Sequence, residues 1–491
     1  MGKSFIHYQT IKGNLYASVY TPRRVEGKKD NQPLYLGRVI DRENGIYQSR
    51  ERGRFKYSVS CGFTSIPTPS FIQEKLILDF GDMYVLHEVL NRSGYWELFR
   101  SILPDMEDTL CTLLCYRVIR GGANRYASDW WTGSYIRELC PKASVESQRV
   151  SEFMAVLGDE QVQRSFFRKY LSKISEGQKN HGILVDSTGM PNDIHFPVTA
   201  INSHNGVISN ETRLILAVDR ITGLPLLYRY NAGNIVDVTT LRSTMLELQA
   251  YGVNVDFSII DAGYYSEKNI KDLYANHIRF ITRLRSNLTL YKTLTTEHSN
   301  TLESRENAVF YRDRLLYIKR VTIVIFGYEA YAYVAIDHQR RSEESYAYMK
   351  QVMSETNLTC EEIDRNAKTK GMFIILSSEC VEITEILPLY YTRQTIEQVF
   401  DLYKNNADLI PLRSHGEDTF RGHLMLSFLS TIVYMLLNNL LDGTRFCADG
   451  AFRSLQNLKC KVFDDCILVK EATKKNNDIA KHLGLEFPLK L

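Results

Sequence analysis

The strongest constraint on the fold is a series of short apolar segments between residues 182 and 283. Two of them, "GILVDSTG" and "VDFSIIDAGYYS", have the length and composition of buried strands, and "RLILAVDRITGLPLLYRY" has the pattern of a hairpin that turns at Thr222-Gly223. The segments "DVTTLRSTMLELQAYG" and "SEKNIKDLYANH" have a helical period, and the strand-like "RFITRL" follows them. Three early strands followed by alternating helices and strands predict a mixed α/β sheet.

Composition changes along the chain and indicates several domains. The first residues form short strand-like runs with basic clusters such as "TPRRVEGKK", whose simplest interpretation is a solvated surface. A helical pattern follows, and strand-like runs such as "EAYAYVAID" interrupt the α/β region after about residue 286. We expect a β-rich N-terminus at 1–65, a helical region at 66–178, an α/β core at 179–288 and 371–437 with a β-rich insertion at 289–370, and a helical tail at 438–491.

Composition also limits the class of protein. The chain has 491 residues, of which 44% are hydrophobic, so it can bury a large core, and its formal net charge of +3 neither requires nor excludes a nucleic-acid partner. Nine cysteines without a CxxC pair favour reduced thiols in the cytoplasm. No signal peptide is evident at the start, and the apolar run at 424–441 is predicted to be a buried core helix of a soluble protein, with no role in a membrane.

The segment "LYYTRQTIEQVFDLYKNN", residues 389–406, predicts one helix with an unusual polar side. At about 100° per residue, the side chains of Tyr390, Arg393, Glu397 and Lys404 would lie within about 60° of one another. An apolar stripe that includes Phe400 would lie beside them. One glutamate is therefore expected among two cations and a phenol at the edge of a buried face.

Three carboxylates suggest a metal site. Asp186 and Asp261 each follow an apolar strand, at the edge of a sheet where ligands gather, and Glu397 lies on a helix expected to pack against that sheet. Clustered oxygen ligands suit Mg²⁺, and two ions held about 4 Å apart can activate a nucleophile and stabilise a leaving oxygen. Taken singly, each acid has a simpler interpretation, because such an Asp is usually a turn or cap residue and such a Glu belongs to a solvated ion pair.

The three motifs together resemble a group of bacterial insertion-sequence transposases that have a DDE catalytic triad and a Y-R-E-K signature. The signature matches Tyr390, Arg393, Glu397 and Lys404, and "ILVDSTG" and "IIDAGYYS" are similar to the two aspartate motifs. The spacings, 261 − 186 = 75 and 397 − 261 = 136 residues, leave room for the insertion that such enzymes carry. The resemblance covers about residues 182–437.

This resemblance implies a ribonuclease H-like fold and cut-and-paste DNA transposition. Asp186, Asp261 and Glu397 would be the catalytic residues and would hold two Mg²⁺ ions, for which Mn²⁺ would substitute. Tyr390, Arg393 and Lys404 would bind the DNA backbone, since cations position phosphate without reading sequence. The implied partners are double-stranded DNA at the element ends and at the target, and a second copy of the chain in the DNA complex. The helical region would read the ends, and the protein would be cytoplasmic, at the nucleoid when active.

Some features depart from the group or leave alternatives open. Ala262 stands where many relatives have an arginine, and all three tryptophans lie in the N-terminal helical region rather than in the insertion. Arg117, Arg120 and Arg125, which lie among aromatic residues, are secondary candidates for a DNA contact, although they also fit an ordinary helix end. The alternatives are a nuclease of the same fold that does not join strands, and a domesticated DNA-binding protein.

Overall fold

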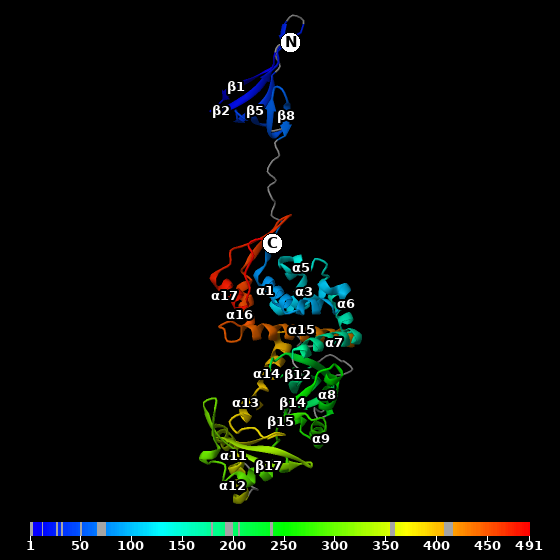
Figure 1. Ribbon diagram of the computed structural model, residues 1–491, viewed down its shortest axis with the longest axis vertical. Coiled ribbons are helices and arrows are strands. Elements are labelled where there is room, and N and C mark those ends of the chain that lie inside the picture. Colours follow the sequence, from blue (N-terminus) through cyan, green and yellow to red (C-terminus); the bar gives the residue numbers. More distant parts are fainter. Residues whose placement is uncertain are drawn as a thin grey trace. The chain divides into compact units, whose positions relative to one another are not determined.

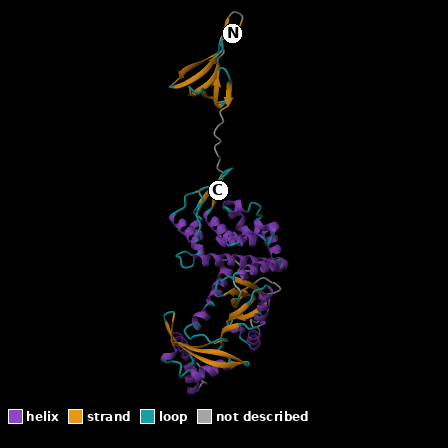
Figure 2. Ribbon diagram, in the orientation of Figure 1, coloured by secondary structure: helices purple, strands orange, loops and turns teal. Residues whose placement is uncertain are grey.

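The computed structural model describes residues 3–11, 13–25, 28–30, 33–49, 52–65, 75–177, 180–191, 200–204, 207–235, 239–353, 359–406 and 416–491. The chain divides into two compact units, Met1–Lys75 with Phe463–Asp465, and Leu76–Val462 with Cys466–Leu491. The first unit consists of strands and loops, whereas the second contains both helices and strands (Figures 1 and 2).

The first unit is an antiparallel sheet of six strands in the order β1-β2-β5-β6-β7-β8. A small core of Ala17, Val19, Leu36, Tyr47 and Phe55 lies on it, because strand alternation sends these side chains to one face. A separate ribbon pairs β3 with β4. The strands are β1 (Phe5–Ile11), β2 (Asn14–Tyr20), β3 (Arg23–Val25), β4 (Lys28–Asp30), β5 (Leu34–Asp41), β6 (Ile46–Ser49), β7 (Gly53–Ser58) and β8 (Gly62–Ser65).

The second unit is built around a ten-stranded sheet in the order β11-β12-β10-β14-β15-β19-β18-β17-β16, in which β13 also pairs with β12. Strand β12 is antiparallel to both β10 and β13, whereas β14 and β15 run parallel to β10. This arrangement confirms the mixed α/β sheet. The strands are β10 (His181–Pro191), β11 (Ala200–His204), β12 (Val207–Asp219), β13 (Pro225–Ala232), β14 (Val255–Ile260) and β15 (Arg279–Arg283), followed by β16 (Ala308–Tyr311), β17 (Arg314–Ile325), β18 (Tyr328–Asp337) and β19 (Met372–Ser377).

Helices cover the sheet on both sides. Helices α8 (Leu241–Ala250) and α9 (Glu267–Ala275) connect the parallel strands and pack against β13, β14 and β15. Helices α13 (Ile386–Tyr391) and α14 (Gln394–Asp401) lie on the other side in Figure 1, where α14 packs against β10. The two aspartate motifs and the 389–406 segment therefore approach the same central strand.

The segment 289–370, predicted as a β-rich insertion, has a different organisation. Its strands β16, β17 and β18 do not form a separate subdomain but extend the core sheet, because β18 pairs with β19 and β19 pairs with β15. The segment also contains three helices, which the sequence interpretation did not assign. These are α10 (Thr289–His298), α11 (His338–Val352) and α12 (Cys360–Lys368). Helix α12 begins with a capping box formed by Thr359 and Glu362.

The helical region and the C-terminal segment form one body. Strand β9 (Leu76–Asp79) pairs with β20 (Lys459–Val462), which pairs with β21 (Ile467–Val469), so the predicted helical tail also contains strands. Its helices α16 (Ala448–Leu455) and α17 (Lys474–His482) pack together, and α16 packs on α1. The N-terminal helices are α1 (Gly81–Arg92), α2 (Tyr95–Arg100), α3 (Glu107–Ile119), α4 (Ala127–Gly133), α5 (Ile136–Leu139), α6 (Ser147–Leu157) and α7 (Glu160–Glu176).

Helix α15 (Glu417–Leu441) connects this body to the sheet. It packs against α3 and α6 and also against β13. The approach to α6 requires glycine, since a Cβ on Gly422 would lie 1.9 Å from the carbonyl oxygen of Met154. By length and composition this is the one helix among the described residues that could cross a membrane, but 78% of its apolar window is buried inside the protein. It is a core helix.

Candidate active site

Two of the predicted carboxylates meet where strand β14 ends beside β10. The two strands run parallel, and their pairing ends with Val185 beside Ile260. The next residues are Asp186 and Asp261, so both aspartates lie at the same edge of this strand pair. Strand β10 was predicted to end at Asp186, but it continues to Pro191, because β12 still pairs with it beyond the end of β14.

The continuous helix predicted at 389–406 is wrong. The segment forms α13, then α14, and then a π-helical turn at Leu402–Asn406. Between residues 392 and 396, the backbone N–H groups of four residues each donate to the carbonyl three positions earlier. In an α-helix each would donate to the carbonyl four positions earlier. Such tighter turns change the angle per residue, so side chains no longer follow one line along a helix. The break instead turns the start of α14 toward the aspartates.

Arg393 lies at the centre of the cluster that results. Its Nη2 atom donates to Asp186 Oδ2 at 2.8 Å and lies 3.1 Å from Asp261 Oδ1. Its Nη1 atom lies 4.0 Å from Glu397 Oε1. The structure therefore brings together all three predicted catalytic carboxylates, but it does so around a guanidinium group.

The cluster is buried on one side and open on the other. The side chain of Asp186 is 12% exposed and that of Glu397 is 57% exposed. Burial raises the pKa of Asp186, and the charge of Arg393 offsets part of this shift. Burial lowers the pKa of Arg393, but the charges of Asp186 and Asp261 outweigh it, and the net shift is upward. Three acids thus surround one arginine that stays protonated, which leaves an excess of negative charge.

Tyr390 borders the cluster from α13. Only 6% of this residue is exposed, and burial raises the pKa of its phenol, so the side chain is a neutral hydrogen-bonding group at neutral pH. Its ring meets that of Tyr391 edge-on, with the ring centroids 5.6 Å apart. Arg283, at the end of β15, is close enough to affect the same phenol electrostatically.

Lys404 lies further along β10. Its Nζ atom donates to the hydroxyl of Thr188, which is two residues beyond Asp186 and therefore on the same face of the strand. Burial lowers the pKa of Lys404, and the charges of Asp401 and Glu211 oppose this shift. The π-helical turn thus directs Lys404 toward the sheet and away from Glu397.

The sequence interpretation missed residues that hold β10 in place at this edge. Thr188 could have been found, because strand alternation in "VDSTG" places it on the same face as Asp186. Arg213 could not, because its role depends on the register between β10 and β12. Its Nε atom donates to the Ser187 hydroxyl at 3.0 Å, and the Ser187 N–H donates to the Asp186 carboxylate at 2.8 Å.

The secondary arginine candidates have different environments. Arg117 is 2% exposed inside the helical body, where a surface DNA contact is impossible. Arg120 pairs with Asp79 at 3.3 Å. Arg125 is exposed and stacks on the neighbouring Tyr126. Arg125 is therefore the one of the three that stays a candidate.

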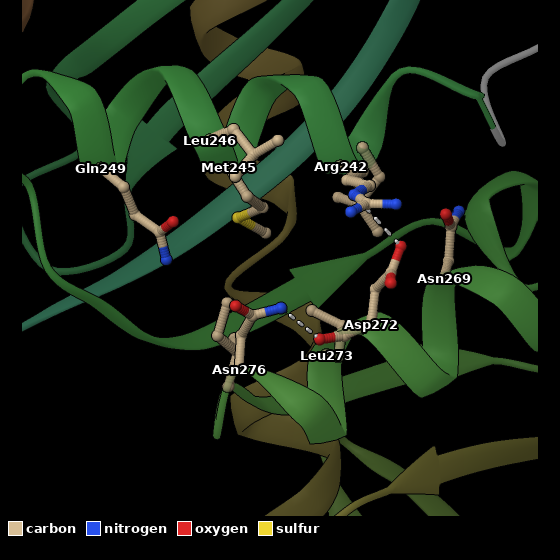
Figure 3. A pocket seen from close by; sticks show the side chains of 10 residues that line it. Arg242, Met245, Leu246, Gln249, Asn269, Asp272, Leu273 and Asn276 are labelled. Atoms are coloured by element: carbon tan, nitrogen blue, oxygen red, sulfur yellow. Dashed lines mark hydrogen bonds and ion pairs between the residues drawn. The ribbon is translucent and has the colours of Figure 1, made fainter.

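A hollow between α8 and α9 lies apart from this cluster (Figure 3). Apolar side chains such as Met245 and Leu273 line it, and Arg242 Nε lies 3.8 Å from Asp272 Oδ2 at its rim. It contains none of the predicted site residues. We assign it no catalytic role, because it contains no group placed for acid–base or nucleophilic chemistry.

Comparison with known proteins assigns the family. The family described as "Transposase DDE domain" matches residues 177–436, which is more than half of the 491-residue chain. The chain belongs to this family. The match includes all three carboxylates and the four residues of the Y-R-E-K pattern.

Other comparisons are more distant. A cryo-EM structure of the piggyBac transposase synaptic complex with hairpin DNA is 10% identical, with 77% of this chain and 79% of that chain covered and a TM-score of 0.40. No curated protein matches the chain. The DDE transposase assignment therefore rests on the family match.

Proposed function

We propose that this DDE transposase catalyses cut-and-paste transposition of a bacterial insertion sequence, by cleaving DNA strands at the element ends and joining them to target DNA. The observation that supports this proposal most is the convergence of Asp186, Asp261 and Glu397 on one guanidinium within the matched family region. The three acids come from two strands and a helix that are far apart in sequence.

The sheet order supports a ribonuclease H-like core. Strands β13, β12 and β10 form an antiparallel group, and β14 and β15 continue the sheet in parallel with β10. Right-handed crossovers through α8 and α9 suit this order, and the carboxyl ends of β10 and β14 would then form the catalytic edge. Strands β16 to β19 extend this core on the far side of β15.

The donor chemistry of the cluster fits divalent metal ions, Mg²⁺ or Mn²⁺. All three acids offer oxygen ligands, and the Arg393 guanidinium shows that two of them already share one cationic neighbour. In this arrangement no three His, Cys, Asp or Glu side chains among the described residues are close enough to hold an ion together. Holding two ions would therefore require Arg393 to move away from the acids and Glu397 to move closer to Asp186 and Asp261.

Bound ions would supply a polarised water or hydroxyl and stabilise the leaving oxygen of a phosphodiester. Asp186 and Asp261 would fix the ligand positions on rigid strands, and Glu397 would complete the set from α14. Arg393, once away from the acids, and Lys404 would hold the DNA backbone beside the scissile phosphate. Tyr390 would donate a hydrogen bond from its phenolic O–H to the same backbone, since its raised pKa means that the phenol stays protonated. A second copy of the chain would take part in the DNA complex.

The test is a cleavage and strand-joining assay on labelled duplexes made from the DNA that flanks the gene, with Mg²⁺ present. The proposal expects cleavage at inverted repeats and joined products with a target plasmid. The variant Glu397→Gln should lose both, whereas the matched control Glu343→Gln, which changes an exposed acid on α11, should keep both. Cleavage without joined products would replace the transposase by the nuclease, and no cleavage by the parent chain would refute both.

A further inference from the structure

The turn between β16 and β17 has a strained backbone. Tyr311 pairs with Arg314, so the turn consists of Arg312 and Asp313 alone. Both have left-handed backbone angles, with φ of 48° and 58°. Two-residue hairpins of this type favour Asn-Gly, because Gly has no Cβ and Asn and Asp tolerate positive φ better than other side chains, so Arg312 fits this turn least. Strain of this kind is typically retained where the side chains have a function.

The turn contacts the candidate active site through stacked rings. The Tyr311 ring stacks on that of Tyr391, with centroids 5.5 Å apart and planes 11° apart. The guanidinium of Arg312 lies 5.2 Å from the centre of the Tyr311 ring and 5.8 Å from that of Tyr391. Tyr391 directly follows Tyr390, the first residue of the Y-R-E-K pattern. The turn is thereby fixed beside that pattern.

Arg312 differs from the arginines that follow it, Arg314 and Arg320, in the groups that it contacts. Arg314 pairs with Asp337 at 2.9 Å, and Arg320 lies 3.8 Å from Glu382. Arg312 is exposed, and within the described part of the chain its recorded contacts are with the two rings only. A guanidinium whose contacts are with aromatic rings keeps N–H groups that can donate to other acceptors.

We propose that this turn presents Arg312 to the phosphate backbone of the DNA bound beside the Y-R-E-K residues. The inference rests on the proposed function and adds a phosphate contact outside the Y-R-E-K pattern. The planar fork of arginine suits two phosphate oxygens, and the contacts of Arg312 with the Tyr311 and Tyr391 rings reduce the entropy lost on binding. The competing explanation is that Arg312 only braces the Tyr311–Tyr391 stack.

Two glycine variants separate these explanations. Arg312→Gly and Asp313→Gly each place glycine at a positive φ, where it is favoured, so both relieve the same kind of strain. They differ in charge, since the first removes a cation and the second an acid. Binding of the full chain to a labelled mixed-sequence duplex is measured by anisotropy across a salt series, and melting temperatures are measured alongside.

The proposal expects Arg312→Gly to weaken binding roughly tenfold and to flatten the log–log salt slope by about one unit, with the melting temperature kept. Asp313→Gly should bind at least as well as the parent with an unchanged slope. An unchanged slope for Arg312→Gly, or equal losses in both variants, would overturn the proposal. If the parent cleaves flanking DNA in those cases, only this inference fails, whereas a parent that binds no DNA refutes the proposed function as well.

Discussion

Strand β10 carries two polar clusters with different surroundings, one at its start and one at its middle. At its start, His181 Nδ1 lies 3.1 Å from Asp219 Oδ2, and each side chain is 1% exposed. Asp219 Oδ1 also accepts two backbone N–H groups and the Thr222 hydroxyl, so it closes the β12–β13 turn. Further along, Asp186 joins Asp261, Glu397 and Arg393 in a cluster that opens to solvent.

The difference concerns charge balance and access. The His181–Asp219 pair is sealed, and the carboxylate has partners for both of its oxygens. The Arg393 cluster has three acids for one cation, and exposure rises from 12% at Asp186 to 57% at Glu397. A sealed cluster with a fully hydrogen-bonded carboxylate contributes to stability, whereas an open cluster with excess negative charge is suited to bind a cation and a phosphate.

The largest expected effect is loss of DNA cleavage when the open cluster is changed. Asp186→Asn, Asp261→Asn or Glu397→Gln should each reduce DNA cleavage by about a thousandfold or more, because several kcal/mol of metal-dependent transition-state stabilisation is lost. Folding and DNA binding should be largely kept, since shape is preserved. Cleavage on labelled ends and binding on the same duplex are measured together. Full cleavage by any one variant would remove that residue from the triad.

The opposite result is expected at the sealed end. Asp219→Ala should lower the free energy of unfolding by roughly 3 kcal/mol or more, because His181 and the buried donors of the turn lose their acceptor. The folded fraction should cleave DNA at the parent rate. Denaturant melts and cleavage normalised to folded protein check this. A folded but inactive variant would show that the two clusters on β10 are functionally coupled.

A second cluster predicts pH dependence. His423 on α15 is partly buried beside Arg117, and desolvation together with this charge lowers its pKa to about 4 from 6.5. A lowered folded-state pKa means that stability is full above pH 6.5 and is lost as the pH falls toward 4. The loss should be about 3 kcal/mol from this group. His423→Gln should reduce the dependence of the melting temperature on pH between 6.5 and 4. If the variant keeps the pH profile of the parent, His423 does not titrate as described.

The smallest measured change should be in the salt dependence of DNA binding, at the cations that hold DNA. Arg393→Ala and Lys404→Ala should lose activity, and each should flatten the salt dependence of end binding by about one unit of log–log slope. If both only formed ion pairs on an exposed face, each pair would stabilise by about 0 to 1 kcal/mol and the slopes would not change. Binding across a salt series, with Lys350→Ala as a control that removes an exposed cation on α11, decides between these outcomes.

Much of the core could be predicted from local pattern. Apolar runs that end in Asp186 and Asp261 indicated a sheet edge, and strand pairing places these residues together. The position of Arg393 could not be predicted, because it depends on a break in the helix that propensities do not reveal. An ideal helix would have kept Arg393 in line with Glu397, whereas the tighter turns direct it between the aspartates.

Other misses involve contacts between distant segments. The pairing of β19 with both β15 and β18 makes the 289–370 strands part of the core sheet, and no local signal encodes that choice. Likewise, no local signal encodes the pairing of β20 with β9, which lies far from it in the sequence. The burial of Arg117 could not be predicted from the sequence either, because Arg117 is buried only when α15 packs on α3. Sequence periodicity reports which face of an element is apolar but does not report its partner.

The central proposal is that the open cluster of Asp186, Asp261 and Glu397 binds divalent cations through its three carboxylates. The most direct test is the melting temperature of the full chain as Mn²⁺ is added, without DNA, for the parent, Asp261→Asn and Arg393→Ala. Binding to the folded state raises the melting temperature. We expect a shift for the parent, a larger shift for Arg393→Ala because the competing guanidinium is gone, and little or none for Asp261→Asn. Equal shifts in the parent and Asp261→Asn would contradict the claim.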